Sequence, residues 1–229
     1  RRRLWKERRA ACGAHAPQLL RQPDPALLAR WVALTGGRVR ILTLAPELEG
    51  AEETIRHAAA QGIVVSLGHH MADRDAVERA VSAGARCCTH LGNGIANTLP
   101  RHPNPIWTQL AEDRLTGLFI TDSHHIPAEF VRVALRAKDV SRFVVTSDAS
   151  SIAGCPPGEY QALGATVISR PDGRIVLKHG DSLAGSSANM AQCMAWLRSL
   201  ELLNEDELVR VGRGNALRLL GIEEAPLEH

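Results

Sequence analysis

Short apolar runs alternate along this chain with longer amphipathic segments. Five runs have the length of buried strands, at residues 39–44, 63–67, 86–89, 115–121 and 142–146. Apolar positions recur with helical spacing between some of them, at residues 51–60, 73–83 and 127–137. Because strand and helix alternate, the pattern predicts a parallel sheet and an α/β fold.

Residues 165–177 depart from this alternation. Two mainly apolar triplets, Val167-Ile168-Ser169 and Ile175-Val176-Leu177, flank Pro171-Asp172-Gly173. A Pro-Asp-Gly turn between two such runs is typical of a β-hairpin. We therefore expect a hairpin inserted into the strand–helix series, followed by helices at 187–200 and 205–220.

The length of the chain favours one domain. Its 229 residues approach the ~250 of a TIM-type (β/α) barrel, so we expect a single barrel domain at 1–226 and the remains of an expression tag at 227–229. Five parallel strands are too few to close such a barrel. We expect an incomplete barrel, with the strand that begins at Val39 at its open side, that associates with another chain or belongs to a larger protein.

Composition excludes several classes of partner. The 27 basic and 25 acidic residues nearly balance, which argues against nucleic acid or an anionic membrane surface as a ligand. The basic opening, residues 1–9, is interpreted as a solvated segment. Five cysteines without a Cys-x-x-Cys pair, and no apolar run of the ~20 residues that span a bilayer, favour the cytoplasm.

Ionisable side chains follow the carboxyl ends of the predicted strands. Glu47, His69 and His90 follow the first three, at intervals that match one strand–helix unit each. The later tips carry Asp122, His124, His125 and Asp148. In a (β/α) barrel these ends meet at one mouth, where the active site lies.

Two neutral imidazoles and a carboxylate are a ligand set for catalytic zinc, and Glu47 is the strand-tip carboxylate that could complete it. Asp148 could take a proton from the attacking water and return it to the leaving group. The residues thus predict a metal-dependent hydrolase. A metal-free phosphosugar isomerase, with Gly185-Ser186-Ser187 as phosphate cradle, would leave the histidines without a role.

Seven motifs, in order along nearly the whole chain, resemble the N-acetylglucosamine-6-phosphate deacetylase family of the amidohydrolase superfamily. They are Gly13-Ala14-His15, Thr43-Leu44-Ala45-Pro46-Glu47, Ser66-Leu67-Gly68-His69, Thr89-His90-Leu91-Gly92-Asn93, Ser147-Asp148-Ala149, Leu183-Ala184-Gly185-Ser186 and Gly214-Asn215-Ala216. The resemblance implies a TIM-type barrel that removes the acetyl group from an N-acetylated amino sugar phosphate. It implies a divalent metal ion, zinc first, with iron or manganese as alternatives.

The resemblance also implies a role for each matching residue. His69 and His90 match the metal-binding histidines, and Asp148 matches the catalytic aspartate. Arg101 would reach the phosphate across a homodimer interface. The other implied substrate contacts are Ala14, His15, Asn93, Gly94, Asp122, His125, Leu183, Ala184 and Gly185.

The chain departs from the family pattern in several respects. Leu91-Gly92-Asn93-Gly94-Ile95 replaces the usual Leu-Phe-Asn-Ala-Met, and His70 replaces a serine or threonine. The Glu-Gly-Pro segment that supplies the family's third metal ligand has no counterpart, and neither do the first strands and the small β domain. Glu47 is then a ligand or a supporting residue, and His70 should point away from His69. The alternative function is a non-catalytic barrel fragment that binds a sugar or a protein partner.

Overall fold

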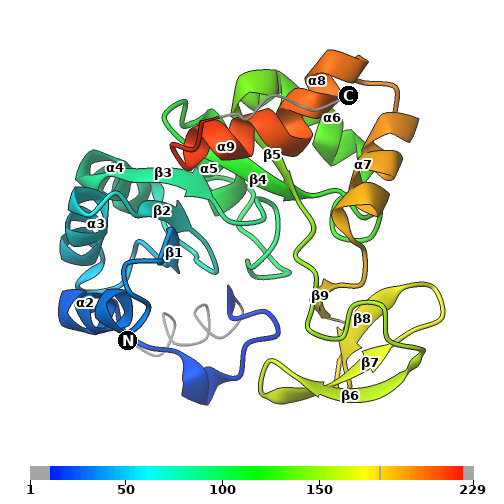
Figure 1. Cartoon of the computed structure of the whole chain (residues 1–229), viewed down its shortest axis with the longest axis horizontal. Coiled ribbons are helices and arrows are strands. Elements are labelled where there is room, and N and C mark those ends of the chain that lie inside the picture. Colours follow the sequence, from blue (N-terminus) through cyan, green and yellow to red (C-terminus); the bar gives the residue numbers. More distant parts are fainter. Residues whose placement is uncertain (1–10, 181, 224–229) are drawn as a thin grey trace.

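The computed structural model describes residues 11–180 and 182–223, so the predictions for 1–9 and 227–229 fall outside the described residues (Figure 1). Five strands form one parallel sheet in chain order: β1 (Ile41–Leu44), β2 (Val64–Leu67), β3 (Ala85–Cys88), β4 (Thr116–Ile120) and β5 (Phe143–Thr146). Each predicted strand is present within two residues of its expected bounds. The α/β class and the parallel sheet are confirmed.

Helices separate the strands and cover one face of this sheet (Figure 1). They are α2 (Pro25–Leu34), α3 (Ala51–Ala60), α4 (Arg74–Ala83), α5 (Pro105–Ala111) and α6 (Ala128–Lys138), with 3-10 turns η1 (Pro17–Leu19) and η2 (Val140–Arg142). We did not predict α5, although its start has a clear signal: Asn104 caps it by accepting from the backbone of Ile106 and Trp107, and Pro105 occupies the first helical position.

The C-terminal helices are α7 (Met190–Ser199), α8 (Glu205–Val209), a π-helical turn η3 (Arg210–Gly214) and α9 (Asn215–Leu219). They pack against β5, with α8 joined to the strand through η3. The buried side chain of Asn215 donates to the carbonyl oxygens of Val140 and Phe143, at 2.6 and 2.7 Å. These two bonds give the Gly214-Asn215-Ala216 motif a structural role, because they hold the last helix against the beginning of β5.

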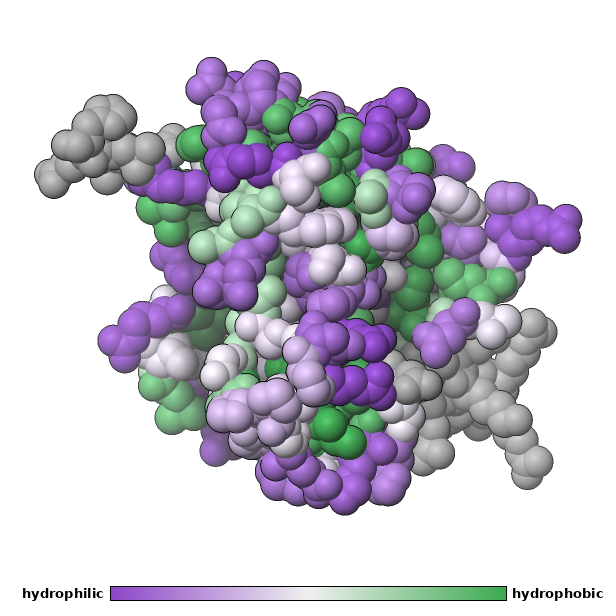
Figure 2. All heavy atoms as spheres, turned by 90° about the vertical axis from the view of Figure 1, so that its right-hand side faces the viewer, coloured by the Kyte–Doolittle hydropathy of each residue, from purple (hydrophilic) through white to green (hydrophobic). Residues whose placement is uncertain are grey.

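The predicted hairpin belongs to a second, antiparallel sheet. Its strands are β6 (Gly158–Ala162), β7 (Ala165–Ser169), β8 (Arg174–Leu177) and β9 (Leu183–Ser186), and β7 and β8 form the hairpin. The sheet lies beside the parallel one, at the lower right of Figure 1. On the side of the molecule toward α7 and this sheet, hydrophilic side chains predominate and apolar ones lie in separate patches (Figure 2).

The two faces of the parallel sheet differ in composition. The helix-covered face is apolar, and the rings of Phe119 and Phe143 stack there with centroids 4.1 Å apart and no exposed surface. Replacing such a ring by alanine typically costs about 3–5 kcal/mol. The opposite face carries the linked hydroxyls of Thr43, Thr89 and Ser66.

Strand β1 forms an edge of the parallel sheet, where we expected it. Ile41, on the same face as Thr43, is 43% exposed, although strands of parallel sheets are ordinarily buried on both faces. Within the described ranges the parallel strands form an open sheet. None of the helices in that part of the chain combines the length and the apolar character needed to cross a membrane.

Candidate active site

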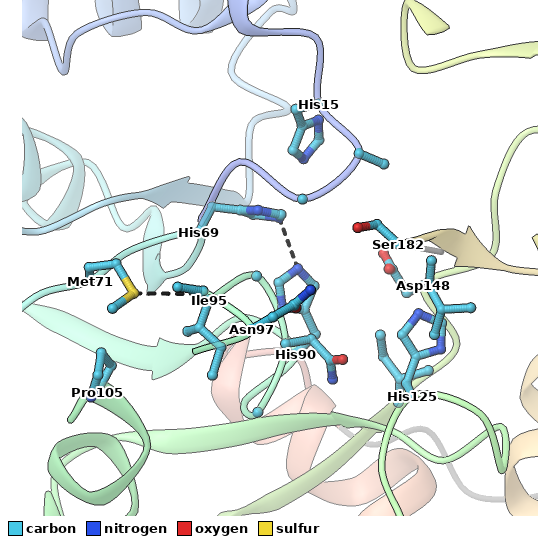
Figure 3. Close-up of a pocket in the computed structure, with 18 of the residues that line it drawn as sticks. His15, His69, Met71, His90, Ile95, Asn97, Pro105, His125, Asp148 and Ser182 are labelled. Atoms are coloured by element: carbon cyan, nitrogen blue, oxygen red, sulfur yellow. Dashed lines mark hydrogen bonds between the residues drawn. The ribbon is translucent and has the colours of Figure 1, made fainter. Parts of the chain in front are cut away.

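A cavity of about 1110 Å³ opens at the carboxyl ends of the parallel strands. His69, His90, His125 and Asp148 line it from four successive strand tips, and Figure 3 shows that they point into the same space. His15 lies next to His69, with the two ring centroids 4.6 Å apart (Figure 3). The structure therefore brings together the side chains on which the sequence-based mechanism depends.

Three of these tips have an unusual backbone. His69, His90 and Asp148 have φ angles of 53°, 32° and 50°, in the left-handed region that residues with a side chain rarely adopt. Such conformations cost on the order of 1–3 kcal/mol each and cluster at functional sites. Their occurrence at three of the four tips that line the cavity is an observation, separate from the motifs, that favours a functional site here.

His69 and His90 form a close imidazole pair. Their Nε2 atoms lie 3.0 Å apart (Figure 3). The Nδ1 atom of His69 lies 3.0 Å from the carbonyl oxygen of Ala11, which can only accept, so the proton of His69 is on Nδ1 and Nε2 carries a lone pair. The buried Nδ1 atom of His90 has no hydrogen-bond partner in the described part of the chain.

Both histidines are neutral at physiological pH. Burial, together with the neighbouring His90 and His15, lowers the pKa of His69 to about 4. Burial also lowers the pKa of His90 to about 4, with contributions from His125 and His15. Neutral imidazole is the form that binds a metal ion, so the pair fits two ligand positions of a divalent cation.

Asp148 lies on the other side of the cavity (Figure 3). Burial raises the pKa of its carboxyl group, although His125, His69 and His15 act in the opposite direction. A raised pKa brings a carboxylate closer to the range in which it can both accept and donate a proton.

A buried pair, Asp122 and His125, supports that side of the cavity. Asp122 Oδ2 accepts from His125 Nδ1 at 2.7 Å, and Oδ1 accepts from the backbone N–H groups of His124 and His125 at 2.9 Å each. Burial acts to raise the pKa of Asp122, but its bonds to His125 and Ser186 outweigh this and lower the pKa well below its usual range. Asp122 thus stays charged and keeps the proton of His125 on Nδ1, which leaves His125 Nε2 for the cavity.

Glu47 and His70 do not line the cavity. Glu47 Oε1 accepts from the backbone of Met71 at 2.9 Å, which ties the end of β1 to the loop after His69. His70 is 1% exposed, and its Nδ1 accepts from Ala72, so its ring points away from the imidazole pair. Among the described residues, no three His, Cys, Asp or Glu side chains are grouped closely enough to hold a metal ion.

The residues expected to contact substrate divide into two sets. Ala14, His15, Asn93, Gly94, His125, Leu183 and Gly185 line the cavity. Arg101, Asp122 and Ala184 do not: Arg101 is exposed, and Ala184 is fully buried behind the wall. Gly94 must be glycine here, because a Cβ atom would lie 2.7 Å from His90 Cε1 and its φ angle is +61°.

Several lining residues were not predicted. Met71 is one of them, and its Sδ atom accepts from the backbone of Ala96 at 3.4 Å, which holds the 92–104 loop over the cavity (Figure 3). Others are Ile95, Asn97, Ser150 and Ser182. They belong to loops, where neither apolar period nor residue chemistry distinguishes a lining side chain from an exposed one.

Comparison with known proteins identifies relatives of this chain. No family model matches it. It is 32% identical over 210 residues to the N-acetylglucosamine-6-phosphate deacetylase of Bacillus subtilis (strain 168), covering 92% of this chain and 52% of that enzyme. It is 32% identical over 212 residues to the N-acetylgalactosamine-6-phosphate deacetylase of Escherichia coli O157:H7, covering 92% and 55%.

A solved structure gives the same result. The crystal structure of N-acetyl-D-glucosamine-6-phosphate deacetylase from Mycobacterium smegmatis matches with a TM-score of 0.86 at 32% identity, over 93% of this chain and 57% of that one. The chain spans about half the length of the curated relatives it matches. The resemblance of the motifs is therefore confirmed: this chain is related, over about half of their length, to the N-acetylglucosamine-6-phosphate deacetylases.

Proposed function

We propose that this chain carries the catalytic side chains of a metal-dependent deacetylase that acts on an N-acetylated amino sugar 6-phosphate. The observation that carries the proposal is the arrangement of His69, His90 and Asp148 on strained tips around one cavity. The names of the relatives include both the glucosamine and the galactosamine substrate, so the substrate class is an N-acetylhexosamine 6-phosphate.

His69 and His90 would hold the metal ion through Nε2. Their neutral state, their 3.0 Å separation and the lone pair on His69 Nε2 fit this role. We propose zinc, with iron or manganese as alternatives, and a further protein ligand from outside the described residues. When bound, the ion supplies polarisation of the N-acetyl carbonyl and lowers the pKa of water.

Asp148 would act as general base and then as general acid. It takes a proton from the water that attacks the N-acetyl carbon, and the same proton goes to the departing nitrogen as the C–N bond breaks. The products are acetate and the free amino sugar phosphate. His125, with Nε2 available on the same side of the cavity, would hold the sugar while the proton moves.

Replacement of Asp148 by asparagine tests this proposal. Asp148→Asn should lower the rate of acetate release from N-acetylglucosamine 6-phosphate about a hundredfold or more, while the metal content stays that of the unchanged protein. The matched control is Asp172→Asn, an exposed aspartate in the β7–β8 turn. Normal turnover by Asp148→Asn would exclude the proposed base.

A second candidate is a non-catalytic barrel fragment that binds a sugar or a protein partner. Two potential metal ligands, His69 and His90, lie together in the described ranges, but no group of three does, and this favours the second candidate. Metal analysis of the purified protein separates the two functions: about one tightly held ion per chain supports the enzyme, and a folded metal-free protein supports the fragment.

We also propose that the protein works in the cytoplasm, as a homodimer or as part of a larger protein. The open edge at β1 and the partly exposed Ile41 support association, because an unpaired parallel edge is a site for pairing with another strand. Cys87, Cys88, Cys155 and Cys193 are free thiols, which fits a reducing compartment.

A further inference from the structure

Ser186, the last residue of β9, is a buried hydroxyl next to the proposed active site. It is 3% exposed and does not line the cavity. Its Oγ atom donates to Asp122 Oδ2 at 2.6 Å and accepts from the backbone of Ala188 at 3.0 Å. Both the proton and a lone pair of the hydroxyl are therefore committed, and its orientation is fixed.

The hydroxyl completes the set of donors to the Asp122 carboxylate. Oδ1 receives two backbone N–H groups, and Oδ2 receives His125 Nδ1 and Ser186 Oγ. With Ser186 in place, Oδ2 has two donors on fixed directions, so the carboxylate cannot rotate away from His125. Removing one of them leaves Oδ2 held through His125 alone.

The backbone of Ser186 is bound to the segment that carries Asp148. Its N–H donates to the carbonyl oxygen of Asp148 at 2.8 Å, and its own carbonyl oxygen accepts from Ser150 at 2.8 Å. The preceding Gly185 permits this close approach, since a Cβ atom there would lie 3.1 Å from Asp148 O. One residue thus contacts both Asp148, through its main chain, and the Asp122–His125 pair, through its side chain.

We propose that Ser186 is a positioning residue for the deacetylation reaction, with its hydroxyl fixing Asp122 Oδ2 so that the His125 ring stays in the orientation that presents Nε2 to the sugar. This inference rests on the proposed function. Ser186 does not line the cavity, so it acts through Asp122 and His125 and not on the substrate itself. Removing such a supporting hydrogen bond typically reduces activity about 10–100-fold.

The test compares Ser186→Ala with Ser187→Ala in the full chain. Ser187 is the matched control, because its hydroxyl donates to the carbonyl oxygen of Gly173 in the hairpin turn and not to the site. The NMR signal of the His125 Nδ1–H proton reports its hydrogen bond to Asp122 without any need for activity. Acetate release from N-acetylglucosamine 6-phosphate reports kcat and KM.

We expect Ser186→Ala to shift or broaden the His125 Nδ1–H signal, because Asp122 Oδ2 is held less firmly against the ring, and to lower kcat/KM at least tenfold, while Ser187→Ala changes neither. Ser186→Cys, which keeps a weak donor, should lie between them and decides the question if the alanine variant does not fold. An unchanged His125 Nδ1–H signal in the Ser186 variants would overturn the proposal, whatever the activity. Absence of acetate release in the unchanged protein would count against the proposed function alone, because the NMR result does not depend on turnover.

Discussion

The two sides of the cavity differ in how completely the protein satisfies their polar groups. On the side of Asp122 and His125, the carboxylate has four donors and the imidazole proton has an acceptor. On the side of His69 and His90, the two Nε2 atoms face each other and His90 Nδ1 has no partner within the described ranges. The first side is preorganised by the protein alone, whereas the second presents two neighbouring Nε2 atoms that a cation would bind together.

The largest expected effect comes from a substitution on the side of His69 and His90. His90→Asn removes one of the two imidazoles, so the metal content should fall from about one ion per chain to near zero, and activity should fall with it to the background. Metal analysis after gel filtration measures the loss. His57→Asn, a histidine in α3 away from the cavity, is the control. Retention of metal by His90→Asn would show that the ion lies elsewhere.

A substitution on the side of Asp122 and His125 should have a smaller effect on activity and none on metal content. An asparagine at 122 presents an amide NH₂ group toward His125 and favours the wrong tautomer. We expect Asp122→Asn to lower kcat/KM about 10–100-fold. A loss of metal in this variant would contradict the independence of the two sides.

Asp122→Asn should also change how the free energy of unfolding depends on pH. Since the pKa of Asp122 is held below its ordinary value of 3.8, its charge stabilises the fold above that pH, and this stabilisation is lost as the pH falls further. Urea unfolding between pH 5 and pH 3 should therefore show a weaker pH dependence in Asp122→Asn than in the unchanged protein. Equal slopes would mean that the carboxylate is not specifically stabilised in the folded state.

The smallest expected effect concerns the phosphate. Arg101 is exposed on the 92–104 loop, and its planar guanidinium suits a phosphate group. Arg101→Ala should raise KM severalfold for the 6-phosphate and leave the unphosphorylated N-acetyl sugar unaffected. Arg136→Ala, on α6, serves as control. Equal changes for both sugars would assign Arg101 a structural role.

The parallel strands and their tips could be predicted from the sequence, because apolar runs and the spacing of one strand–helix unit are local signals. The small sheet was predicted in part: the Pro171-Asp172-Gly173 turn indicated β7 and β8, whereas β6 and β9 contain glycine and polar residues that interrupt the apolar pattern of a strand. Strand β9 also owes its position to the non-local pairing of Ser186 with the Asp148 segment, which no local pattern encodes.

Within the site, residue type and position predicted His69, His90 and Asp148, but not how they are held. The strained φ angles, the bond from His69 to Ala11 and the role of Glu47 at the backbone of Met71 depend on contacts between distant segments. Glu47 illustrates the limit: a carboxylate at a strand tip was a candidate ligand, and the structure places it against the loop behind the histidines.

The metal stoichiometry of the protein tests the central claim most directly. It is measured on one preparation before chelation, after chelation, and after reloading with zinc, iron or manganese. We predict about one ion per chain, removal by the chelator with loss of acetate release, and recovery of both on reloading. A folded protein that takes up none of the three metals, or that releases acetate equally well without them, would contradict the assignment of His69 and His90 as a metal site.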